Sequence, residues 1–288
     1  PQHRAVVWVA LVDALAATEV DPRDLLRLFA AAWPAEDHPS ILARIGGFVC
    51  QRVLQEYLPP EEVPQARRVV AGAARRRLES ATPGSTQAIA AARVLAAATD
   101  DVGLLRSWAY HQDLPVGLED DADFRWAVLR ALAVLGETDP DEIERVRQED
   151  PSLQGKLGAL TARAALPGAE HKAWAWEQLV GASDRSNYEM NALASGFWIS
   201  GGADLLRGYV PRFHRDVPAL ADRVGQDALA RVAALAYPRT VVEQATDDAT
   251  SARLAEGHLS PAVRRALVDQ QSVLREVLAS RERFAVRA

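Results

Sequence analysis

Histidine and carboxylate side chains are the first candidates for chemistry in this 288-residue chain, because together they bind catalytic zinc in many enzymes. A zinc-binding helix needs two histidines four residues apart, so that both imidazoles project from one face. No two of the six histidines are three or four residues apart, and Glu170-His171 lacks a second histidine at that spacing. We therefore expect surface or structural roles for His3, His38, His111, His171, His214 and His258.

The densest group of carboxylates runs from Glu119 to Asp123 and suggests a magnesium site. In helical terpene synthases, acids one turn apart hold Mg²⁺ with a bound diphosphate. That spacing requires an acid where this chain has Phe124, and no second acidic motif follows on a later helix. We favour acids at a helix start, where they complement the helix dipole. A magnesium-dependent enzyme using Asp120 and Asp121 remains the weakest of three hypotheses.

Neither the clustered arginines nor the single cysteine indicates a binding site. Five arginines share one helix, and we expect them to be solvated or paired with Glu61, Glu62 and Glu79 rather than bound to phosphate: Arg67, Arg68, Arg75, Arg76 and Arg77. Cys50 excludes a disulfide framework, and its apolar surroundings predict a buried, inert thiol. The sequence contains no nucleotide-binding glycine loop and no G-x-S-x-G nucleophile turn. The chain by itself therefore offers no active site.

Composition narrows the class of protein further. The net charge of −6 argues against a nucleic-acid partner, and no apolar run is long enough to span a membrane. The apolar residues 5–12 are interrupted by Asp13 and lack a cleavage site, so we expect a helix rather than a signal peptide. Low cysteine content is typical of a cytoplasmic protein. Because the chain begins at Pro1 inside a helical pattern, we expect it to be part of a longer polypeptide.

Helix signals dominate the sequence, and strand signals are nearly absent. Asp21-Pro22, Asp139-Pro140 and Ser260-Pro261 each place a capping side chain before a proline at the first helical position. We predict an all-α fold of about fourteen or fifteen helices with short connections. The predicted helices span residues 4–17, 22–32, 39–57, 64–80, 85–98, 101–111, 121–135, 140–149, 152–166, 169–180, 186–197, 202–215, 218–236, 246–257 and 261–282.

The order of these helices predicts the architecture. Short connections favour antiparallel pairs, and regularly recurring pairs favour a curved, HEAT- or armadillo-like superhelical array with a concave face. No tetratricopeptide or ankyrin consensus is present. Residues 112–119 are the least helical stretch and mark a possible soft break, but apolar residues flank them and no polar linker appears. We therefore expect one domain over residues 1–288.

A series of apolar and aromatic segments follows a recognisable order. It comprises residues 4–8, 124–133, 173–176, 186–189, 196–198, 209–213 and 237–240. In order and spacing these segments resemble the C-terminal helical domain of actinobacterial aminopeptidase N, over essentially the whole chain. The chain departs from that family at Ile199-Ser200-Gly201-Gly202, where the family usually carries a proline and a glutamine.

The resemblance implies a role without chemistry of its own. The family comprises cytoplasmic zinc metallopeptidases that remove N-terminal residues from peptides, and its H-E-x-x-H and G-x-M-E-N motifs are absent here. It implies no catalytic or metal residue in this chain, with zinc held by a separate catalytic domain of the same polypeptide. This domain would cover the active-site chamber and restrict or orient peptide substrates, with arginines facing the substrate carboxylate. Candidate chamber-wall residues, chosen because they lie in the matching segments, are Arg125, Asn187, Tyr188, Trp198 and Arg212.

A second hypothesis is a stand-alone helical-repeat scaffold that binds other proteins. An array of helix pairs without a cofactor site suits either role. Under the leading hypothesis the parent protein is a zinc metalloaminopeptidase, and no activity is expected of this chain alone.

Overall fold

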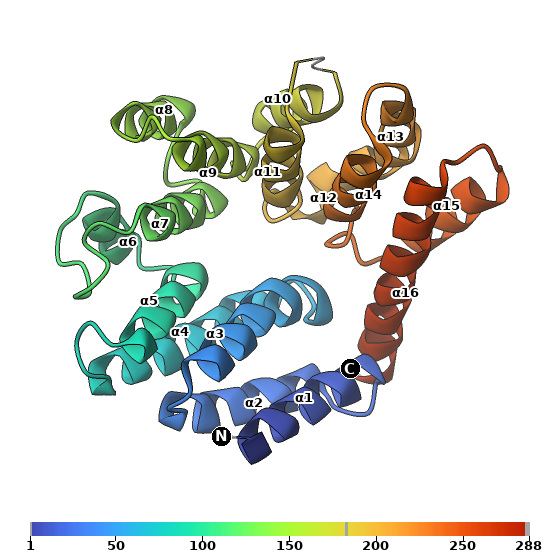
Figure 1. Cartoon of the computed structure of the whole chain (residues 1–288). Coiled ribbons are helices and arrows are strands. Elements are labelled where there is room, and N and C mark those ends of the chain that lie inside the picture. Colours follow the sequence, from blue (N-terminus) through green and yellow to red (C-terminus); the bar gives the residue numbers. More distant parts are fainter. Residues whose placement is uncertain (1, 182–183, 286–288) are drawn as a thin grey trace. The chain divides into compact units, whose positions relative to one another are not determined.

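The computed structural model describes residues 2–181 and 184–285, and in these ranges every regular element is a helix (Figure 1). The predicted all-α fold is confirmed. The α-helices are α1 (Gln2–Ala16), α2 (Pro22–Ala32), α3 (Pro39–Phe48), α4 (Val63–Ser80), α5 (Thr86–Ala98), α6 (Val102–Ala109), α7 (Ala122–Leu135), α8 (Pro140–Glu149), α9 (Leu153–Ala164), α10 (Ala169–Val180), α11 (Asn187–Phe197), α12 (Gly202–Leu206), α13 (Val210–Asp216), α14 (Gln226–Leu235), α15 (Gln244–Ala255) and α16 (Pro261–Arg283). Short 3₁₀ segments cover Trp33–Ala35, Arg207–Tyr209 and Pro218–Asp222, and Val49–Tyr57 continues α3 as a π-helix.

The predicted capping signals mark real helix starts. The Asp21 side chain accepts the backbone N–H of Arg23 at the start of α2, at 2.8 Å. Asp139 likewise accepts the N–H of Glu142 at 2.8 Å, at the start of α8. Because each cap satisfies a backbone donor that the first turn leaves unpaired, these helices begin where the sequence places the cap.

Two predicted helices are wrong as continuous elements. Residues 202–215 divide into α12, a 3₁₀ turn and α13, with Pro211 in the first turn of α13. Residues 218–236 divide into a 3₁₀ turn and α14, because Gly225 adopts an extended ψ of 151° that no helix can contain. Apolar periodicity alone does not reveal such a break, since residues on both sides still bury one face.

The contacts of the chain sort into two compact units. The first contains residues up to Val128 together with those from Glu276 onward, and the second runs from Leu129 to Arg275. The unit boundaries therefore fall within α7 and α16 rather than in residues 112–119, which belong to the first unit. A single domain over residues 1–288 stays a prediction.

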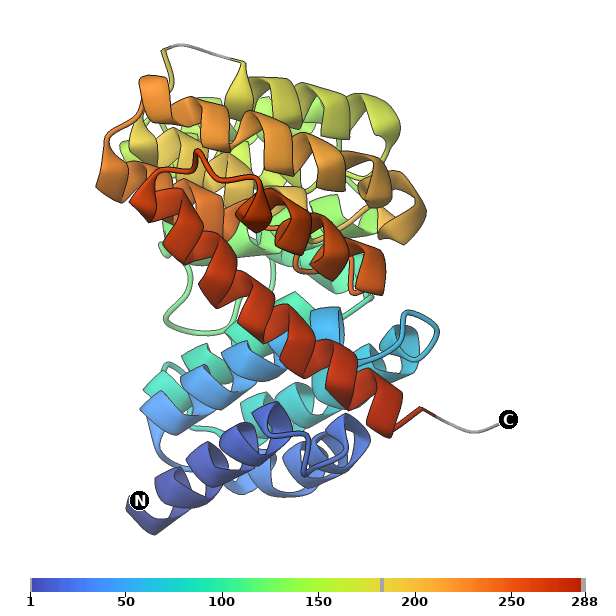
Figure 2. The ribbon, with the colours of Figure 1, turned by 90° about the vertical axis from the view of Figure 1, so that its right-hand side faces the viewer.

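In the first unit, α1 packs on α2, α2 packs on α4, and α5 packs on both α3 and α4 (Figure 2). Phe29 and Trp33 stack in its core with ring centroids 5.0 Å apart. The buried indole N–H of Trp33 donates to the carbonyl oxygen of Leu42 at 3.2 Å, so the largest core side chain leaves no unpaired donor.

In the second unit, α9, α11 and α14 form one layer, and α8 and α10 lie outside it against α9 and α11 (Figure 1). A close approach of α9 and α11 depends on Gly196. A Cβ placed there would lie 2.2 Å from the carbonyl oxygen of Thr161 and 3.0 Å from the Cβ of Ala164. No helix in the described ranges combines the length and the apolar character needed to cross a membrane.

Candidate functional site

The five candidate chamber-wall residues fall in different surroundings. Arg125, on α7, belongs to the first unit, whereas the other four belong to the second. The half-buried Arg125 guanidinium donates from Nε to the carbonyl oxygen of Ala109 at 3.0 Å, which ties α7 to the end of α6. This contact gives Arg125 a structural task within its own unit.

Asn187 and Tyr188 begin α11 and are exposed, with 66% of Tyr188 accessible to solvent. They lie within a capping box, in which Ser186 accepts the N–H of Glu189 and Glu189 accepts the N–H of Ser186. The box holds the first turn of α11 in place, so the phenol and amide are presented from a fixed backbone. Both side chains are free to meet a ligand or another domain.

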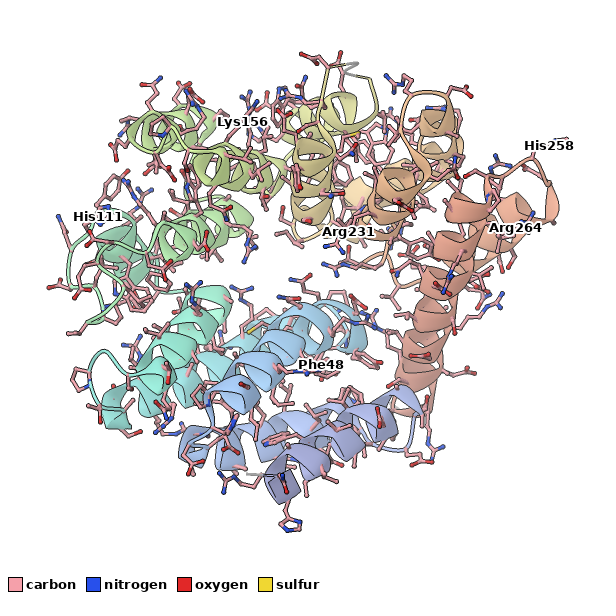
Figure 3. All side chains as sticks on the ribbon, viewed as in Figure 1. Phe48, His111, Lys156, Arg231, His258 and Arg264 are labelled. Atoms are coloured by element: carbon pink, nitrogen blue, oxygen red, sulfur yellow. The ribbon has the colours of Figure 1, made fainter. Side chains whose placement is uncertain are left out.

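Glu189 is the centre of a small charged cluster at this helix start. Its carboxylate lies 3.0 Å from Arg185 Nη1 and 3.0 Å from the Nζ of Lys156, a residue of α9 that Figure 3 labels. Burial alone would raise the pKa of Glu189, but hydrogen bonds from Ser186, Lys156 and Arg185 outweigh it and lower the pKa to about 2. The cluster therefore stays ionised and serves to fix α9 against α11.

Trp198 is a core residue, with 2% of its surface exposed. Its indole N–H donates to the carbonyl oxygen of Ala236 at 2.7 Å, and its ring meets Phe197 edge-on at 4.9 Å. Trp176 and Tyr209 complete this aromatic cluster. Packing explains this tryptophan fully, and its side chain does not reach the surface.

Arg212 projects from α13 into solvent and lies over the face of Tyr209, with 4.9 Å between its Cζ and the ring centroid. Such a cation–π contact orients a guanidinium while leaving its N–H groups available. Among the predicted residues of the second unit, the exposed polar groups are therefore Asn187, Tyr188 and Arg212.

Lys172 is a buried residue that the sequence gives no reason to single out. None of its surface is exposed, and its Nζ donates to the carbonyl oxygens of Ala164 at 2.8 Å and Phe197 at 2.6 Å and to Ser200 Oγ at 3.1 Å. These carbonyls end α9 and α11, so two of the ammonium's three donors close two helix C-termini and the third binds Ser200. Burial lowers the pKa of Lys172 to about 7.

The second unit contains further arginines that no sequence pattern singles out, among them Arg130 and Arg231. Arg130, on α7, is half-buried without an ion-pair partner among the described residues, and burial lowers its pKa. Arg231 projects from α14 on the side away from α13, and no acid in the described part of the chain pairs with it (Figure 3). Pairing depends on tertiary neighbours, so no sequence signal separates these arginines from the others.

We expected the arginines of α4 to be solvated or paired with glutamates. In the described ranges none of them pairs with Glu61, Glu62 or Glu79, whereas Arg68, Arg75 and Arg76 are exposed. Glu62 instead binds Arg23, with 2.8 Å between Oε2 and Nε. The α4 arginines reach backbone carbonyls, side-chain oxygens or Asp101: Arg67 to Thr99, Arg68 to Gln65, Arg75 to Asp101, Arg76 to Ala30 and Arg77 to Ser80. Cys50 is buried, as predicted, and burial raises its pKa to about 12.

One residue of the acidic run before α7, Asp121, caps that helix. Asp121 Oδ1 accepts the N–H of Phe124 at 2.8 Å, and Arg93 pairs with Oδ2 of the same carboxylate. Across residues 2–181 and 184–285, no three His, Cys, Asp or Glu side chains are grouped so as to hold a metal ion. The described residues thus provide no ligand set for zinc.

Comparison with known proteins identifies the chain's relatives. A family model described as ERAP1-like C-terminal domain matches residues 1–276. Aminopeptidase N of Streptomyces lividans is 27% identical over 278 residues, which are 96% of this chain and 32% of that protein. The chain therefore spans about a third of the length of this relative. Because the family model covers nearly all of it, the chain belongs to the family of ERAP1-like C-terminal domains.

Proposed function

We propose that the chain is the non-catalytic C-terminal domain of a zinc-dependent aminopeptidase, where it covers the active-site chamber and restricts or orients peptide substrates. The observation that carries the proposal is the family match over residues 1–276, joined to a relative named aminopeptidase N that is about three times as long. The zinc and its ligands would lie in the remaining part of such a polypeptide, and the whole protein would act in the cytoplasm.

Exposed polar groups of the second unit would form the chamber wall. Of the five residues proposed from the sequence, Asn187, Tyr188 and Arg212 have side chains free to contact a peptide. Trp198 and Arg125 would contribute indirectly, by fixing helix positions through a core indole and an α6–α7 contact.

Arg231 is the strongest additional candidate for the wall. Its guanidinium is exposed, has no acid partner among the described residues, and projects from the α9–α11–α14 layer (Figure 3). A guanidinium binds a carboxylate through two parallel N–H bonds, and an unpaired one loses no existing ion pair when it does so. The C-terminal carboxylate of a peptide is the ligand that this chemistry fits.

Substrate pairs that differ only at the carboxylate test this role. In the full-length enzyme, Arg231→Ala should lower kcat/KM for a peptide about tenfold or more, since a hydrogen bond to a charged group contributes about 1.5–3 kcal/mol. The same peptide with a C-terminal amide, and an aminoacyl anilide, should be unaffected. Arg265→Ala is the matched control, because Arg265 is exposed and already faces Asp269 at 3.8 Å.

Equal loss for the acid and the amide would show that Arg231 acts only on folding or docking. If peptide kinetics are unchanged in Arg231→Ala, Arg212→Ala and Tyr188→Ala, the chamber-wall role is rejected. The alternative, a stand-alone scaffold, requires a gene that encodes this span alone.

A further inference from the structure

Residues 5–12 of helix α1 are all apolar and extend around the helix, yet only one side of this stretch is covered. Trp8 and Leu15 face the first unit and are 6% and 0% exposed. On the other side Val6, Val7 and Val9 are 67%, 57% and 57% exposed. A helix that is apolar on all sides is normally buried on all sides, because removing apolar side chains from water lowers the free energy of the folded state.

The exposed side is a firmly held surface. Arg4 Nε lies 3.0 Å from Glu36 Oε2, and Glu36 also accepts the backbone N–H groups of Asp37 and His38 at 2.9 Å each. Together with the buried Trp8, this buried carboxylate fixes α1 against the rest of its unit. The valines are therefore displayed in a defined arrangement.

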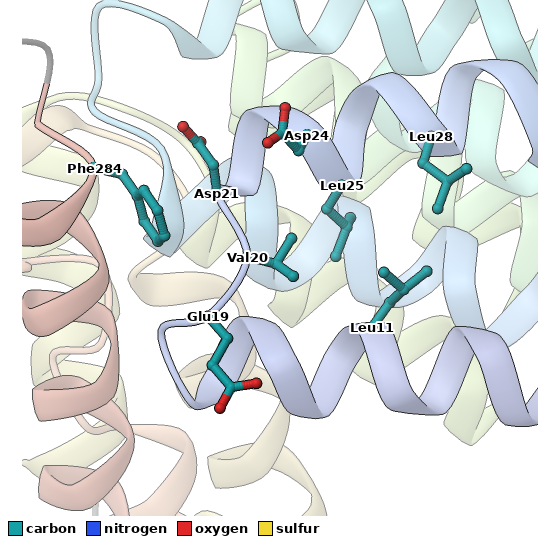
Figure 4. A pocket seen from close by; sticks show the side chains of 8 residues that line it. All are labelled: Leu11, Glu19, Val20, Asp21, Asp24, Leu25, Leu28 and Phe284. Carbon is teal, nitrogen blue, oxygen red and sulfur yellow. The ribbon is translucent and has the colours of Figure 1, made fainter.

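This apolar surface continues from α1 onto α2. Leu11, one turn after Val7, and Leu28, which is 38% exposed, border a cavity of about 440 Å³ between the two helices (Figure 4). Val20 and Leu25 also line it, and Phe284 closes one end.

Carboxylates surround this cavity. Asp21 and Asp24 already pair with Arg23 and Arg27, whereas the exposed Glu19 has no ion-pair partner in the described part of the chain. The cavity thus offers an apolar floor and one unneutralised acid to whatever covers it (Figure 4).

We propose that Val6, Val7, Val9, Leu11 and Leu28, hereafter the α1 face, dock the remaining part of the same polypeptide, which presents apolar side chains and a lysine or arginine that reaches Glu19. This inference rests on the proposed function, because it takes the chain as one domain of a longer aminopeptidase. The relative that matches 96% of this chain has about two thirds of its length outside the match, enough to supply a large covering surface. An apolar surface rimmed by charge is the usual form of such an interface.

Thiol labelling tests the proposal directly. A Val7→Cys variant should react rapidly with a maleimide in the 288-residue chain. In the full-length enzyme the labelling rate should be lower by a factor of about ten or more, because a covered thiol is reached only through local opening. Native Cys50 gives little background, since it is buried and its raised pKa of about 12 keeps it a thiol. Leu153→Cys, at a position 60% exposed in the second unit, is the matched control.

Equal labelling of Val7→Cys in both proteins would overturn the proposal. So would concentration-dependent protection in the 288-residue chain with a dimer in sedimentation, because a second copy would then be the occupant. As an independent readout, Val7→Asp with Val9→Asp should lower the Tm of the full-length enzyme but not that of the 288-residue chain. Val268→Asp, at a 49% exposed position, should lower neither.

The two proposals fail separately. If Val7→Cys is protected but peptide kinetics are unchanged in Arg231→Ala, Arg212→Ala and Tyr188→Ala, the α1 face is kept as a docking surface and the chamber-wall role is rejected. Loss of carboxylate selectivity in Arg231→Ala combined with unprotected Val7→Cys would keep the substrate role and reject this face.

Discussion

At the residue scale, two buried ionisable side chains of the second unit, Lys172 and His214, are expected to affect its stability. Lys172 donates to carbonyl oxygens at the ends of α9 and α11 that have no partner within their own helices. Its ammonium has three donors and meets three acceptors, whereas a neutral amine could serve only two. Burial opposes the charge, and these hydrogen bonds together with the negative ends of two helix dipoles favour it.

Replacing Lys172 by methionine should therefore destabilise the protein by about 1–3 kcal/mol, because two buried carbonyls lose their donor. The pH profile should also change. The pKa of Lys172 falls from 10.5 to about 7 on folding, so the folded state binds this proton more weakly than the unfolded chain. Its contribution to the free energy of unfolding rises from pH 7 to 10.5 and is lost as the pH falls through 7.

Urea unfolding at several pH values measures both effects. The difference between wild type and Lys172→Met should vary with pH across that window. Lys156→Met, which alters a half-exposed lysine, is the control for the same series. A difference that is constant with pH would mean that Lys172 contributes only packing.

His214 is the second buried titratable group. Its Nε2 lies 3.3 Å from Thr250 Oγ1, which also lies 3.0 Å from the Tyr237 hydroxyl, and its buried Nδ1 has no hydrogen-bond partner among the described residues. Burial first, and the nearby Arg253 charge second, lower its pKa from 6.5 to about 4. The site accepts a neutral imidazole and rejects an imidazolium.

Stability should consequently fall by about 3 kcal/mol as the pH drops from 6.5 to 4, since each unit of pKa difference corresponds to about 1.4 kcal/mol. The sign follows from the lowered folded pKa: the contribution is present above pH 6.5 and is lost as the pH falls through 4. In His214→Gln this part of the acid-induced loss should disappear, while His3→Gln, an exposed site, should keep it. Thermal melts by circular dichroism across pH 4–7 measure this loss. If His214→Gln loses as much stability as the wild type between pH 6.5 and 4, protonation of His214 is not the cause.

At the element scale, residues that are neighbours in the sequence determine where a helix starts, but they do not determine how helices pack. Asp21, Asp139 and Ser260 cap their helices as the sequence predicts, because a cap acts on the N–H groups two or three residues ahead. Breaks without a cap signal, such as the one at Gly225, escape the same reasoning. The sequence also does not show whether a glycine in a helix merely lowers helix propensity or allows two helices to come into close contact.

Gly196 illustrates the second case and gives a direct test. Gly196→Ala should destabilise the protein by about 1–3 kcal/mol, because the added methyl meets the backbone of α9 rather than a movable side chain. Gly47→Ala, in α3 with nothing within 4 Å of the added Cβ, should be neutral or stabilising by about 0.5–1 kcal/mol. Denaturant midpoints that shift equally in both variants would show that helix propensity, rather than the α9–α11 contact, governs Gly196.

At the scale of the whole molecule, the arginines divide into those that bind other groups of the protein and those that have no such partner. Most arginines of the described chain are engaged with carboxylates or backbone oxygens, as Arg23 is with Glu62 and Arg281 with the carbonyls of Glu56 and Leu58. In the second unit Arg231, Arg145 and the half-buried Arg130 have no carboxylate or backbone-oxygen partner among the described residues. In the first unit the α1 face is left uncovered. Under the proposed function, the remaining part of the polypeptide or a peptide substrate would complete the contacts at these places.

The sequence by itself determined the helical class, most helix bounds and the resemblance to an aminopeptidase C-terminal domain. Those features depend on periodicity, caps and the order of apolar segments, which act between neighbours along the chain. The resemblance segments 186–189 and 196–198 prove to be a capping box and core aromatic residues, so they report fold rather than chemistry.

Only the tertiary structure decided which polar groups are available. In the folded chain Lys172 and Trp198 are buried, whereas Tyr188 and Arg231 are exposed. Three valines of α1 are exposed as well. Burial and pairing depend on residues that are distant in sequence, such as Phe197 for Lys172 and Ala236 for Trp198. A local pattern predicts that a side chain is apolar or charged, but its partner is set by the packing of helices.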